Sequence, residues 1–402
     1  MISVLVVDDS VVVRRLIVDA LGGAPDIEVV GTAANGLLAQ ARIDQLKPDV
    51  VTMDIEMPQM DGITAVRELR KRHPRLPVIM FSTLSAAGAT ATLEALAAGA
   101  TDYVTKPSNV GSVAESIAAV REQLIPRIHA LAARRPGTPS TRTTPAGSAR
   151  PGVTRPPGGT ATPARPVPGR PFLSAASGAT TPKVATPAST TPARPSTRPA
   201  GRVDLLAIGS STGGPDALTV LLQALPTSLP VPVVVTQHMP PVFTRMFAER
   251  LNRSTPLTVV EAGDGMILAP GTVYIAPGDR HLVLSRRGTS TVIGLSSAPP
   301  ENSCRPAVDV MFRSVSEVFG AAAYAAVLTG MGYDGREGAR VLRSTGAEVL
   351  AQDEATSVVW GMPGAVVGAG LADAVLPLDQ IAPALLSRVN VGRSSRPTAV
   401  TR

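Results

Sequence analysis

Three aspartates and two later polar residues follow apolar runs of the N-terminal third, and together they could accept a phosphoryl group. Asp8 and Asp9 directly follow the first apolar run, and Asp54 follows the third. Carboxylate oxygens bind Mg²⁺, and a carboxylate beside this ion can attack a phosphoryl group because the ion screens the charge that repels the donor. Ser82 and Lys106, which end the next two runs, can donate a hydrogen bond and a positive charge to the phosphoryl oxygens. Any one of these residues alone is better explained as a helix cap, but their order along the strand ends favours a site.

A second candidate site centres on Ser211, in a glycine-rich segment between an apolar run and a helical pattern. Gly209 to Gly213 satisfies G-x-S-x-G, the spacing of a serine nucleophile on a tight turn. Two other interpretations stay open. The glycines could cradle a phosphate, although the segment lacks the G-x-G-x-x-G order and the lysine of a P-loop. The hydroxyl side chains could simply cap the helix that follows.

A serine nucleophile needs a base, and the C-terminal half offers two histidines. His238 follows the apolar run VPVVVTQ, whereas His281 begins an expected strand, where a solvated or structural role is favoured. Asp334 follows a buried strand and a glycine-rich loop, which suits the orienting carboxylate. The order Ser211, His238, Asp334 results. An α/β-hydrolase would place the acid before the histidine, and only Asp279 with His281 could do so, from positions too close to belong to separate strand ends.

The elements that position the first site alternate between strands and helices. Apolar runs predict strands at 2–7, 27–32, 50–53, 78–82 and 100–105. Helical patterns predict helices at 11–21, 36–45, 62–71, 88–97 and from about 113 to 133. Five βα units with continuous apolar strands predict a parallel sheet covered on both faces. The strand ends of such a sheet converge on a crevice where the strand order reverses.

The pattern of buried strands restarts after Arg202 and continues to about residue 389. Five apolar runs predict strands there: VDLLAIG, VPVVVTQH, TVYIAP, AYAAVLTG and AEVLAQ. Because helical segments follow several of them, we expect a second doubly wound, mainly parallel α/β domain over 202–389. The polar segment 390–402 is expected to be a flexible tail.

The segment 135–201 differs in composition from both flanking regions. Between Pro136 and Ala200 it holds eight basic residues, no acidic ones and 15 of the 38 prolines. Such a composition cannot bury enough apolar surface to fold, so a disordered linker is expected. The net charge of +7 therefore belongs to the linker, and the rest of the chain is near neutral, which argues against nucleic acid as a partner. With one cysteine and no apolar run of membrane-spanning length, a cytoplasmic protein without membrane insertion is expected.

Residues 1–134 resemble the receiver domain of two-component response regulators. The matching segments are VLVVDDS, VVTMDIEMPQMDG, PVIMFSTL and DYVTKP. The resemblance implies a flavodoxin-like (βα)5 domain in which Asp54 is the phosphoacceptor. It also implies that Mg²⁺ is held by Asp8, Asp9, Asp54 and the backbone carbonyl of Glu56. Ser82, Lys106 and Tyr103 would then read out the phosphoryl group.

Residues 203 to about 389 resemble the catalytic domain of the chemotaxis protein-glutamate methylesterases. The matching segments are IGSSTGGPDAL, VVVTQHMP, RPAVDVMF, LTGMGYDG and VVWGMPGAV. The resemblance implies Ser211 as nucleophile, His238 as general base and Asp334 as the orienting carboxylate. It further implies the backbone N–H of Met331 as oxyanion donor, with Thr212 and Met239 lining the site.

Together the two resemblances imply a phosphorylation-activated serine hydrolase. Its expected reactions are hydrolysis of glutamate methyl esters and deamidation of certain glutamines on methyl-accepting chemoreceptors. The expected phosphodonor is the chemotaxis histidine kinase, and the esterase reaction needs no cofactor beyond the receiver's Mg²⁺. We expect a monomer. Two other classes remain open: a DNA-binding response regulator, which would need a basic helix-turn-helix, and a module whose glycine-rich loop binds a nucleotide without catalysis.

Overall fold

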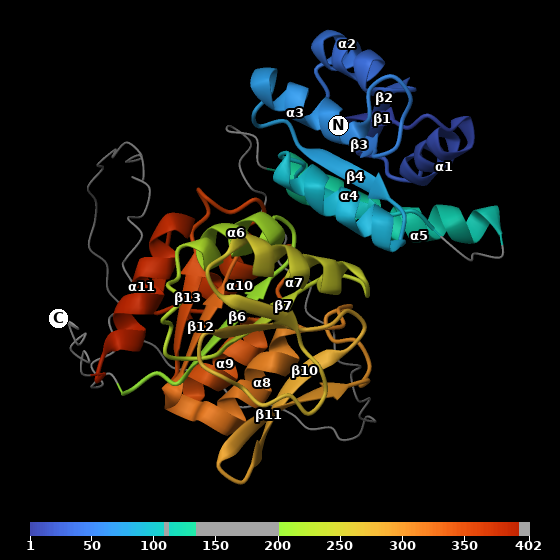
Figure 1. The fold of residues 1–402 in the computed structure, drawn as a ribbon. Coiled ribbons are helices and arrows are strands. Elements are labelled where there is room, and N and C mark those ends of the chain that lie inside the picture. The colour runs from blue at the N-terminus through green and yellow to red at the C-terminus, as the bar shows by residue number, and fades with distance from the viewer. Residues whose placement is uncertain (108–111, 134–200, 394–402) are drawn as a thin grey trace, which may run out of the picture. The chain divides into compact units, whose positions relative to one another are not determined.

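The computed structural model describes residues 1–107, 112–133 and 201–393 (Figure 1). The predicted linker 135–201, apart from Gly201, and the predicted tail beyond residue 393 lie outside the described residues. Among the helices of the described ranges, none is both long enough and apolar enough to cross a membrane.

The N-terminal domain consists of five βα units, as the sequence predicts. Its elements are β1 (Ile2–Val7), α1 (Val11–Leu21), β2 (Ile27–Ala33), α2 (Gly36–Leu46), β3 (Val50–Asp54), α3 (Gly62–Arg72), β4 (Val78–Ser82), α4 (Ala86–Ala97), β5 (Asp102–Thr105) and α5 (Val113–Ala132). The strands pair in parallel in the order β2-β1-β3-β4-β5, the flavodoxin-like order. Helices α1 and α5 pack together on one side of the sheet, and α2, α3 and α4 form the other layer (Figure 1).

The C-terminal domain is a second α/β domain, and the prediction of a mainly parallel doubly wound sheet is confirmed. Its elements are β6 (Leu205–Ser210), α6 (Gly214–Gln223), β7 (Val233–Gln237), α7 (Phe243–Ser254), β8 (Thr258–Glu261), β9 (Thr272–Ile275), β10 (His281–Arg287), β11 (Ser290–Ser296), α8 (Val308–Phe319), η1 (Gly320–Ala322), β12 (Ala323–Val327), α9 (Arg336–Ser344), β13 (Glu348–Gln352), α10 (Met362–Gly368), β14 (Ala374–Leu376) and α11 (Leu378–Asn390). Seven strands pair in parallel in the order β14-β13-β12-β6-β7-β9-β8.

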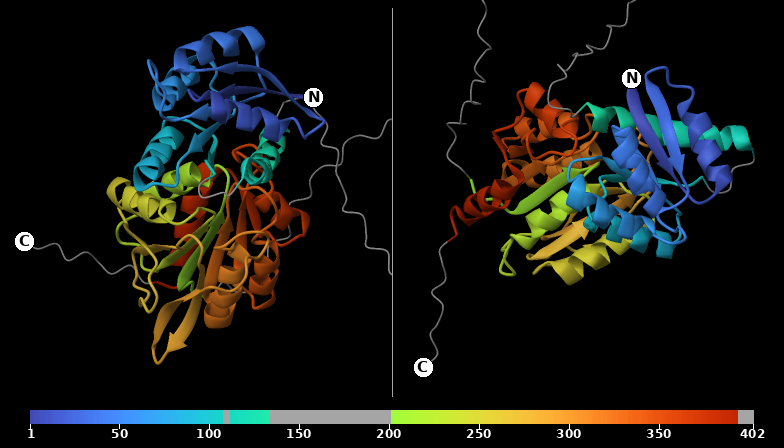
Figure 2. Two further views of the ribbon diagram at one scale, coloured as in Figure 1. Left: turned by 90° about the vertical axis from the view of Figure 1, so that its right-hand side faces the viewer. Right: turned by 90° about the horizontal axis from the view of Figure 1, so that it is seen from above.

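A separate antiparallel hairpin, β10–β11, joins this sheet to α8. Figure 2 shows the hairpin projecting away from the parallel sheet. The start of β10 at His281 agrees with the strand expected there, whereas β8, β11 and β14 have no counterpart among the strands that the sequence predicts. The segment from β9 to α8 therefore holds more ordered structure than the sequence analysis indicated.

The central strand of the second sheet, β6, is buried on both faces. Leu205 and Ala207 pack in the cluster that contains α8, whereas Leu206 and Ile208 pack in the cluster that contains α6 and α7. This alternation explains the unbroken apolar run of the strand, because both faces of a doubly wound sheet are covered by helices. The chain passes from β6 to β7 on one side and returns to β12 on the other. The carboxyl end of β6 is therefore the switch point at which ligands bind in such sheets.

Two side chains near the end of the C-terminal domain are hydrogen-bonded to the backbone at its beginning. The Arg393 guanidinium donates to the carbonyl of Val203 at 2.7 Å. The Arg388 guanidinium donates to the carbonyl of Gly201 at 2.7 Å. Two arginines at the end of the domain thus hold the backbone at its beginning.

Candidate functional site

Ser211 and His238 come together because they follow two neighbouring strands in register. Ser210 ends β6 and pairs with Gln237, which ends β7. The backbone N–H of His238 also donates to the carbonyl of Ser210, at 3.2 Å. Ser211 directly follows β6 and His238 directly follows β7. The two candidate residues therefore lie side by side at the carboxyl edge of the sheet.

A buried amide that the sequence analysis did not single out links these two strand ends. Gln237 accepts a hydrogen bond from the Ser210 hydroxyl at 2.7 Å. Its amide nitrogen donates to the carbonyls of Ser211, at 3.0 Å, and His238, at 3.3 Å. A Cβ at Gly214 would lie 2.0 Å from the Gln237 Oε1 atom, so the glycine gives room to this amide. The close approach at Gly214 thus serves a protein side chain, which does not favour the phosphate-cradle interpretation.

Asp334 contacts His238 and is itself saturated with hydrogen bonds. Its Oδ2 atom lies 2.8 Å from His238 Nε2 and accepts from the Val308 N–H at 2.6 Å. Its Oδ1 atom accepts from the N–H groups of Asp309 and Gly335, each at 3.0 Å. Val308 and Asp309 open α8, so Asp334 sits at the positive end of that helix. Although burial opposes it, the bond from His238 and these N–H groups hold the pKa of Asp334 below its usual value.

The imidazole of His238 lies between Asp334 and the single cysteine of the chain. Nε2 faces Asp334, and Nδ1 lies 3.5 Å from the Cys304 sulfur. Burial lowers the pKa of His238, but the contacts with Asp334 and Cys304 outweigh it and raise this pKa above its ordinary value. Within the described part of the chain, the Ser211 hydroxyl makes no hydrogen bond to the ring. Apo enzymes often form that bond only when substrate is bound.

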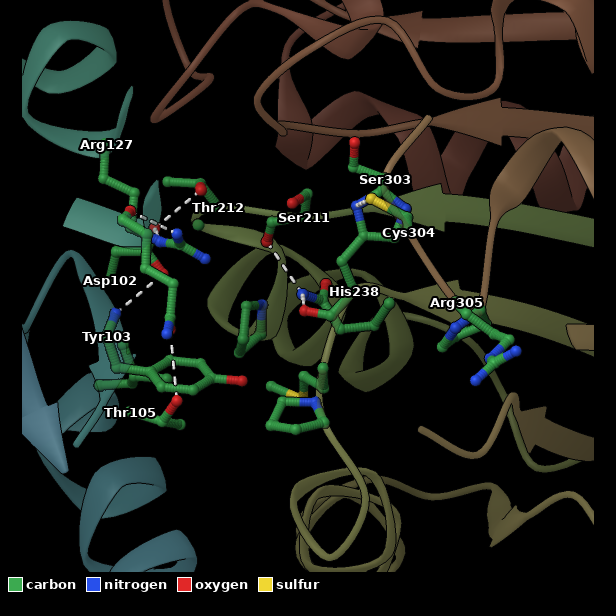
Figure 3. A pocket seen from close by; sticks show the side chains of 18 of the residues that line it. Asp102, Tyr103, Thr105, Arg127, Ser211, Thr212, His238, Ser303, Cys304 and Arg305 are labelled. Atoms are coloured by element: carbon green, nitrogen blue, oxygen red, sulfur yellow. Dashed lines mark hydrogen bonds and ion pairs between the residues drawn. The ribbon is translucent and has the colours of Figure 1, made fainter. Parts of the chain in front are cut away.

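The remaining predicted residues of this site, Thr212, Met239 and Met331, differ in their relation to the pocket beside Ser211, which the unpredicted Cys304 also lines. From the C-terminal domain, Thr212 and Cys304 line the same pocket as Ser211 and His238 (Figure 3). Met239 lines it as well. In the described structure, Met331 is not part of this lining, but its neighbour Gly330 touches Ser211. A Cβ at Gly330 would lie 2.9 Å from Ser211 Cβ, and the N–H of Ser211 donates to the carbonyl of Thr329 at 3.0 Å. The glycine-rich loop therefore passes directly beside the candidate nucleophile.

The alternative pair Asp279 and His281 is not assembled as a catalytic pair. The ring of His281 is fully buried, accepts from the Ala307 N–H at 3.1 Å through Nδ1, and lies 3.1 Å from the Pro299 carbonyl through Nε2. Asp279 pairs instead with Arg305, whose Nε lies 2.9 Å from its carboxylate. His281 is thus structural, which is one of the two roles that the sequence favoured.

In the N-terminal domain, the predicted acidic residues converge. Carboxylate oxygens of Asp8, Asp9 and Asp54 all lie within 4.8 Å of one another. Lys106 Nζ lies 2.8 Å from Asp54 Oδ1 and 3.3 Å from Asp8 Oδ2. Burial and then the charge of Asp54 raise the pKa of Asp8 to about 6, and burial also raises the pKa of Asp54. The concentration of negative charge is therefore only partly neutralised by the lysine.

These residues surround a cavity of about 270 Å³ whose chemistry suits a hard cation and phosphoryl oxygens. The lining includes Asp9, Asp54, Glu56, Ser82 and Lys106. Apart from the ion pair with Lys106, the buried Oδ2 atom of Asp8 accepts no hydrogen bond from any described residue. A divalent cation would satisfy this oxygen.

Two of the predicted readout residues differ in their relation to the cavity. Ser82 lines it, and its hydroxyl accepts from the Thr92 hydroxyl at 2.6 Å. Tyr103 lies on β5 opposite Met80 of β4, and within the described structure it does not line the cavity. Five predicted residues thus line the cavity, namely Asp9, Asp54, Glu56, Ser82 and Lys106, whereas the predicted Tyr103 lies on β5 outside the described lining.

Comparisons with known families agree with this division of the chain. Residues 4–118 match the response regulator receiver domain family, and residues 206–385 match the CheB methylesterase family. A protein from Nocardioides sp. (strain ATCC BAA-499 / JS614) is 53% identical over 394 residues, covering 98% of this chain and 97% of that protein. A protein from Trichodesmium erythraeum (strain IMS101) is 42% identical over 386 residues, covering 96% and 98%. Both are named protein-glutamate methylesterase/protein-glutamine glutaminase.

Two solved structures from Thermotoga maritima are similar to the separate domains. The CheB methylesterase catalytic domain is 43% identical and covers 46% of this chain and 99% of its own, with a TM-score of 0.46. The response regulator domain of CheB is 43% identical and covers 34% of this chain and 99% of its own, with a TM-score of 0.31.

Proposed function

The chain belongs to the CheB family of protein-glutamate methylesterases/protein-glutamine glutaminases, and on this premise we propose that Ser211, His238 and Asp334 form its catalytic triad. One observation carries the proposal. His238 is bonded to the buried Asp334 through Nε2 and leaves the sheet beside Ser211 from the next strand. The substrates are glutamate methyl esters, and certain glutamines, on methyl-accepting chemoreceptors.

In the proposed reaction, the Ser211 hydroxyl oxygen attacks the ester carbonyl carbon, and Nδ1 of His238 takes its proton. Asp334 holds the ring and stabilises the imidazolium that forms. The backbone N–H of Met331 donates to the oxyanion, in a pocket that Thr212 and Met239 help to line. The tetrahedral intermediate collapses, and methanol leaves with the proton from His238.

A water molecule then attacks the glutamyl ester of Ser211, and His238 again takes a proton. The acyl–oxygen bond to Ser211 breaks, the serine regains its proton, and the receptor glutamate is released. In deamidation the same steps release ammonia in place of methanol. No cofactor takes part in this reaction.

The experiment for this proposal measures methanol released from methylated receptor by Ser211→Ala. The rate should fall by at least ~10³-fold while the protein stays folded, which is the scale of losses when a triad serine is removed. Turnover near that of the wild type would exclude a serine nucleophile at this position.

We also propose that Asp54 accepts a phosphoryl group from a chemotaxis histidine kinase and that its phosphorylation activates the hydrolase. Asp8, Asp9, Asp54 and the carbonyl of Glu56 would hold Mg²⁺, which neutralises charge between the carboxylate and the phosphoryl group. Asp54 attacks the phosphorus atom as the bond to the donor nitrogen breaks. Ser82 and Lys106 bind the phosphoryl oxygens, and Tyr103 takes the family's aromatic switch position.

Full-length protein tests this regulation directly. Acetyl phosphate with Mg²⁺ should label Asp54 and raise the rate of methanol release, and Asp54→Asn should abolish both effects. Stimulation that survives in Asp54→Asn would place the phosphoacceptor elsewhere. The proposed unit boundaries are 1–134 for the receiver, 202–389 for the catalytic domain, 135–201 for the linker and 390–402 for the tail.

A further inference from the structure

A tight turn lies beside the candidate triad and precedes α8. The N–H of Glu301 donates to the carbonyl of Cys304 at 3.0 Å, and the N–H of Cys304 donates back to Glu301 at 2.8 Å. The two residues between them, Asn302 and Ser303, have φ values of 53° and 62°. Two successive left-handed residues inside a reciprocal backbone pair are the geometry of a type I′ turn, which tolerates asparagine well. The turn therefore fixes the direction in which the Asn302 side chain leaves the backbone.

The Asn302 amide bridges two buried carboxyl groups. Its Nδ2 atom donates to Asp334 Oδ1 at 3.0 Å and to Asp309 Oδ2 at 2.9 Å. Asp309 and Asp334 are only 1% and 2% exposed, so bulk solvent does not screen their charges from each other. An amide nitrogen carries two hydrogens, and this geometry uses one on each carboxyl.

The groups around this bridge favour Asp334 as the ionised member of the pair. Asp309 Oδ1 accepts only the Gly338 N–H, at 2.6 Å, among described residues, whereas Asp334 also receives His238 and three backbone N–H groups. Burial, and then the charge of Asp334, raise the pKa of Asp309 to about 6. The remaining charged neighbours are Glu301 and Arg313, which pair with each other at 2.8 Å.

We propose that Asn302 is a positioning residue for hydrolysis: its amide holds Asp334 against His238 and separates Asp334 from the neighbouring Asp309 carboxyl. This inference rests on the proposed triad. Because Asp334 must keep Oδ2 on His238, the hydrogen bonds to its other oxygen set the rotation of the whole carboxylate. Asn302 supplies the side-chain member of that set, and among the described residues it is not part of the lining of the pocket where substrate would bind.

Three variants of the full-length protein test the proposal. Asn302→Gly keeps a residue suited to the left-handed turn but removes the amide. Asn302→Asp keeps the size of the side chain but exchanges a donor for an acceptor. Ser303→Gly is the matched control, because it makes the same change at the other left-handed position of the turn and leaves both carboxyls bridged.

For Asn302→Gly, kcat for methanol release should fall by roughly 10- to 100-fold, the scale of a lost hydrogen bond to a charged group. KM should change little, since the amide does not touch substrate. In the Ser303→Gly control the turn and the carboxyl bridge remain, so the pH profile should keep its wild-type shape. Because Ser303 lines the pocket, any change should fall on KM.

For Asn302→Asp, the pH profile should change shape. A carboxyl at this position can donate to Asp334 only while it is protonated, and three adjacent carboxyls raise one another's apparent pKa values. The variant should therefore lose activity as pH rises, in the range where wild-type activity is still rising. A merely structural role for Asn302 would lower the rate without this inversion.

A spectroscopic measurement separates this inference from the triad proposal. The ring N–H proton of His238 that is shared with Asp334 should give a downfield NMR resonance, and Asn302→Gly should shift or broaden it even in protein that also carries Ser211→Ala.

If Ser211→Ala keeps turnover, the triad proposal fails, and the resonance still decides the role of Asn302. If Asn302→Gly is folded and keeps the wild-type kcat, pH profile and resonance, the positioning role is wrong. Should Asn302→Gly not fold, a wild-type profile in Asn302→Asp would overturn the proposal equally.

Discussion

Both domains place carboxylates at the switch point of a parallel sheet, but the two sets are held in different ways. In the C-terminal domain, Asp334 accepts hydrogen bonds from His238, Asn302 and three backbone N–H groups. In the N-terminal domain, Asp8, Asp9 and Asp54 face one another, and Lys106 is the cation that pairs with two of them. In the first set the carboxylate is satisfied by hydrogen bonds from described residues, whereas in the second the negative charge is only partly neutralised by Lys106.

On the proposed roles, this difference separates two uses of the same position in an α/β sheet. A triad carboxylate must not move during turnover, so its surroundings are preorganised by the protein. A phosphoacceptor must release and regain its partners as the phosphoryl group comes and goes, so its surroundings are left partly unsatisfied. Four changes would break or sharpen this comparison.

The largest effect is expected for Asp334→Asn in full-length protein. Its amide cannot accept all the hydrogen bonds that the carboxylate accepts, and it no longer stabilises the imidazolium. We expect kcat for methanol release to fall on the order of 10⁴-fold, the scale seen when a triad aspartate becomes asparagine.

Asp373→Asn is the matched control for that substitution. Asp373 also accepts a backbone N–H, from Val349 at 2.8 Å, but it lies on the far side of β13 from the triad loop and pairs with Arg343. It should affect stability without a comparable loss of rate. Equal losses in the two variants would mean that Asp334 is important only for folding.

A smaller effect is expected from alkylation of Cys304 with iodoacetamide. The thiol lies 3.5 Å from His238 Nδ1, so an added acetamide group should displace the ring that receives the serine proton. Displacing a catalytic group by about 1 Å can lower the rate about 10²-fold. Because the chain has a single cysteine, Cys304→Ala should be insensitive to the reagent. Fully alkylated enzyme, verified by mass spectrometry, with an unchanged rate would contradict this expectation.

The pH dependence of kcat/KM should follow the raised pKa of His238. The imidazole can accept the serine proton only when it is neutral, so activity should rise with pH and level off above this pKa. The acid limb should lie above the ordinary histidine value of about 6.5, with about a tenfold loss for each unit below it. Cys304→Ala removes one cause of the increase and should move the limb to lower pH. A limb at the ordinary value in both proteins would show that neither contact acts on the ring during turnover.

The smallest effect concerns Mg²⁺ and the thermal stability of the N-terminal domain. At a concentration ten times its Kd, an ion that binds only the folded state stabilises it by about 1.4 kcal/mol, or several degrees in Tm. Calorimetry should show this shift in the transition of the N-terminal domain and not in that of the C-terminal domain. In Asp8→Asn, which removes the buried unsatisfied oxygen, the shift should shrink. A shift in the C-terminal transition instead would reverse the comparison.

Much of this architecture could be predicted from the sequence, because the strands are unbroken apolar runs that end in polar or glycine residues. β1, β4 and α1 begin and end where the sequence predicts, and β5 is two residues shorter at its start. β14 could not be found in this way. It has three residues at the edge of the sheet, and its partly exposed side chains leave no apolar signal.

The residues of the C-terminal site that the sequence analysis missed share a physical cause. Gln237, Asn302 and Cys304 have no spacing that predicts chemistry, because each acts through a partner far away in the chain. Gln237 carried one usable signal, a polar residue inside a fully buried strand, which must be hydrogen-bonded. Asn302 and Cys304 carried none, since their roles depend on the turn that directs them toward Asp334 and His238.

The hydrogen bonds from Arg388 and Arg393 to the backbone at Gly201 and Val203 have a consequence for protein engineering. Since the catalytic domain begins and ends at one place on its surface, it can be excised and inserted into a surface loop of a host protein without stretching either junction. A new N-terminus and C-terminus could likewise be opened at the tip of the β10–β11 hairpin after the old ends are joined by a short glycine linker. Ser211, His238 and Asp334 would keep their neighbours in either rearrangement, because all three follow strands in the interior of the sheet.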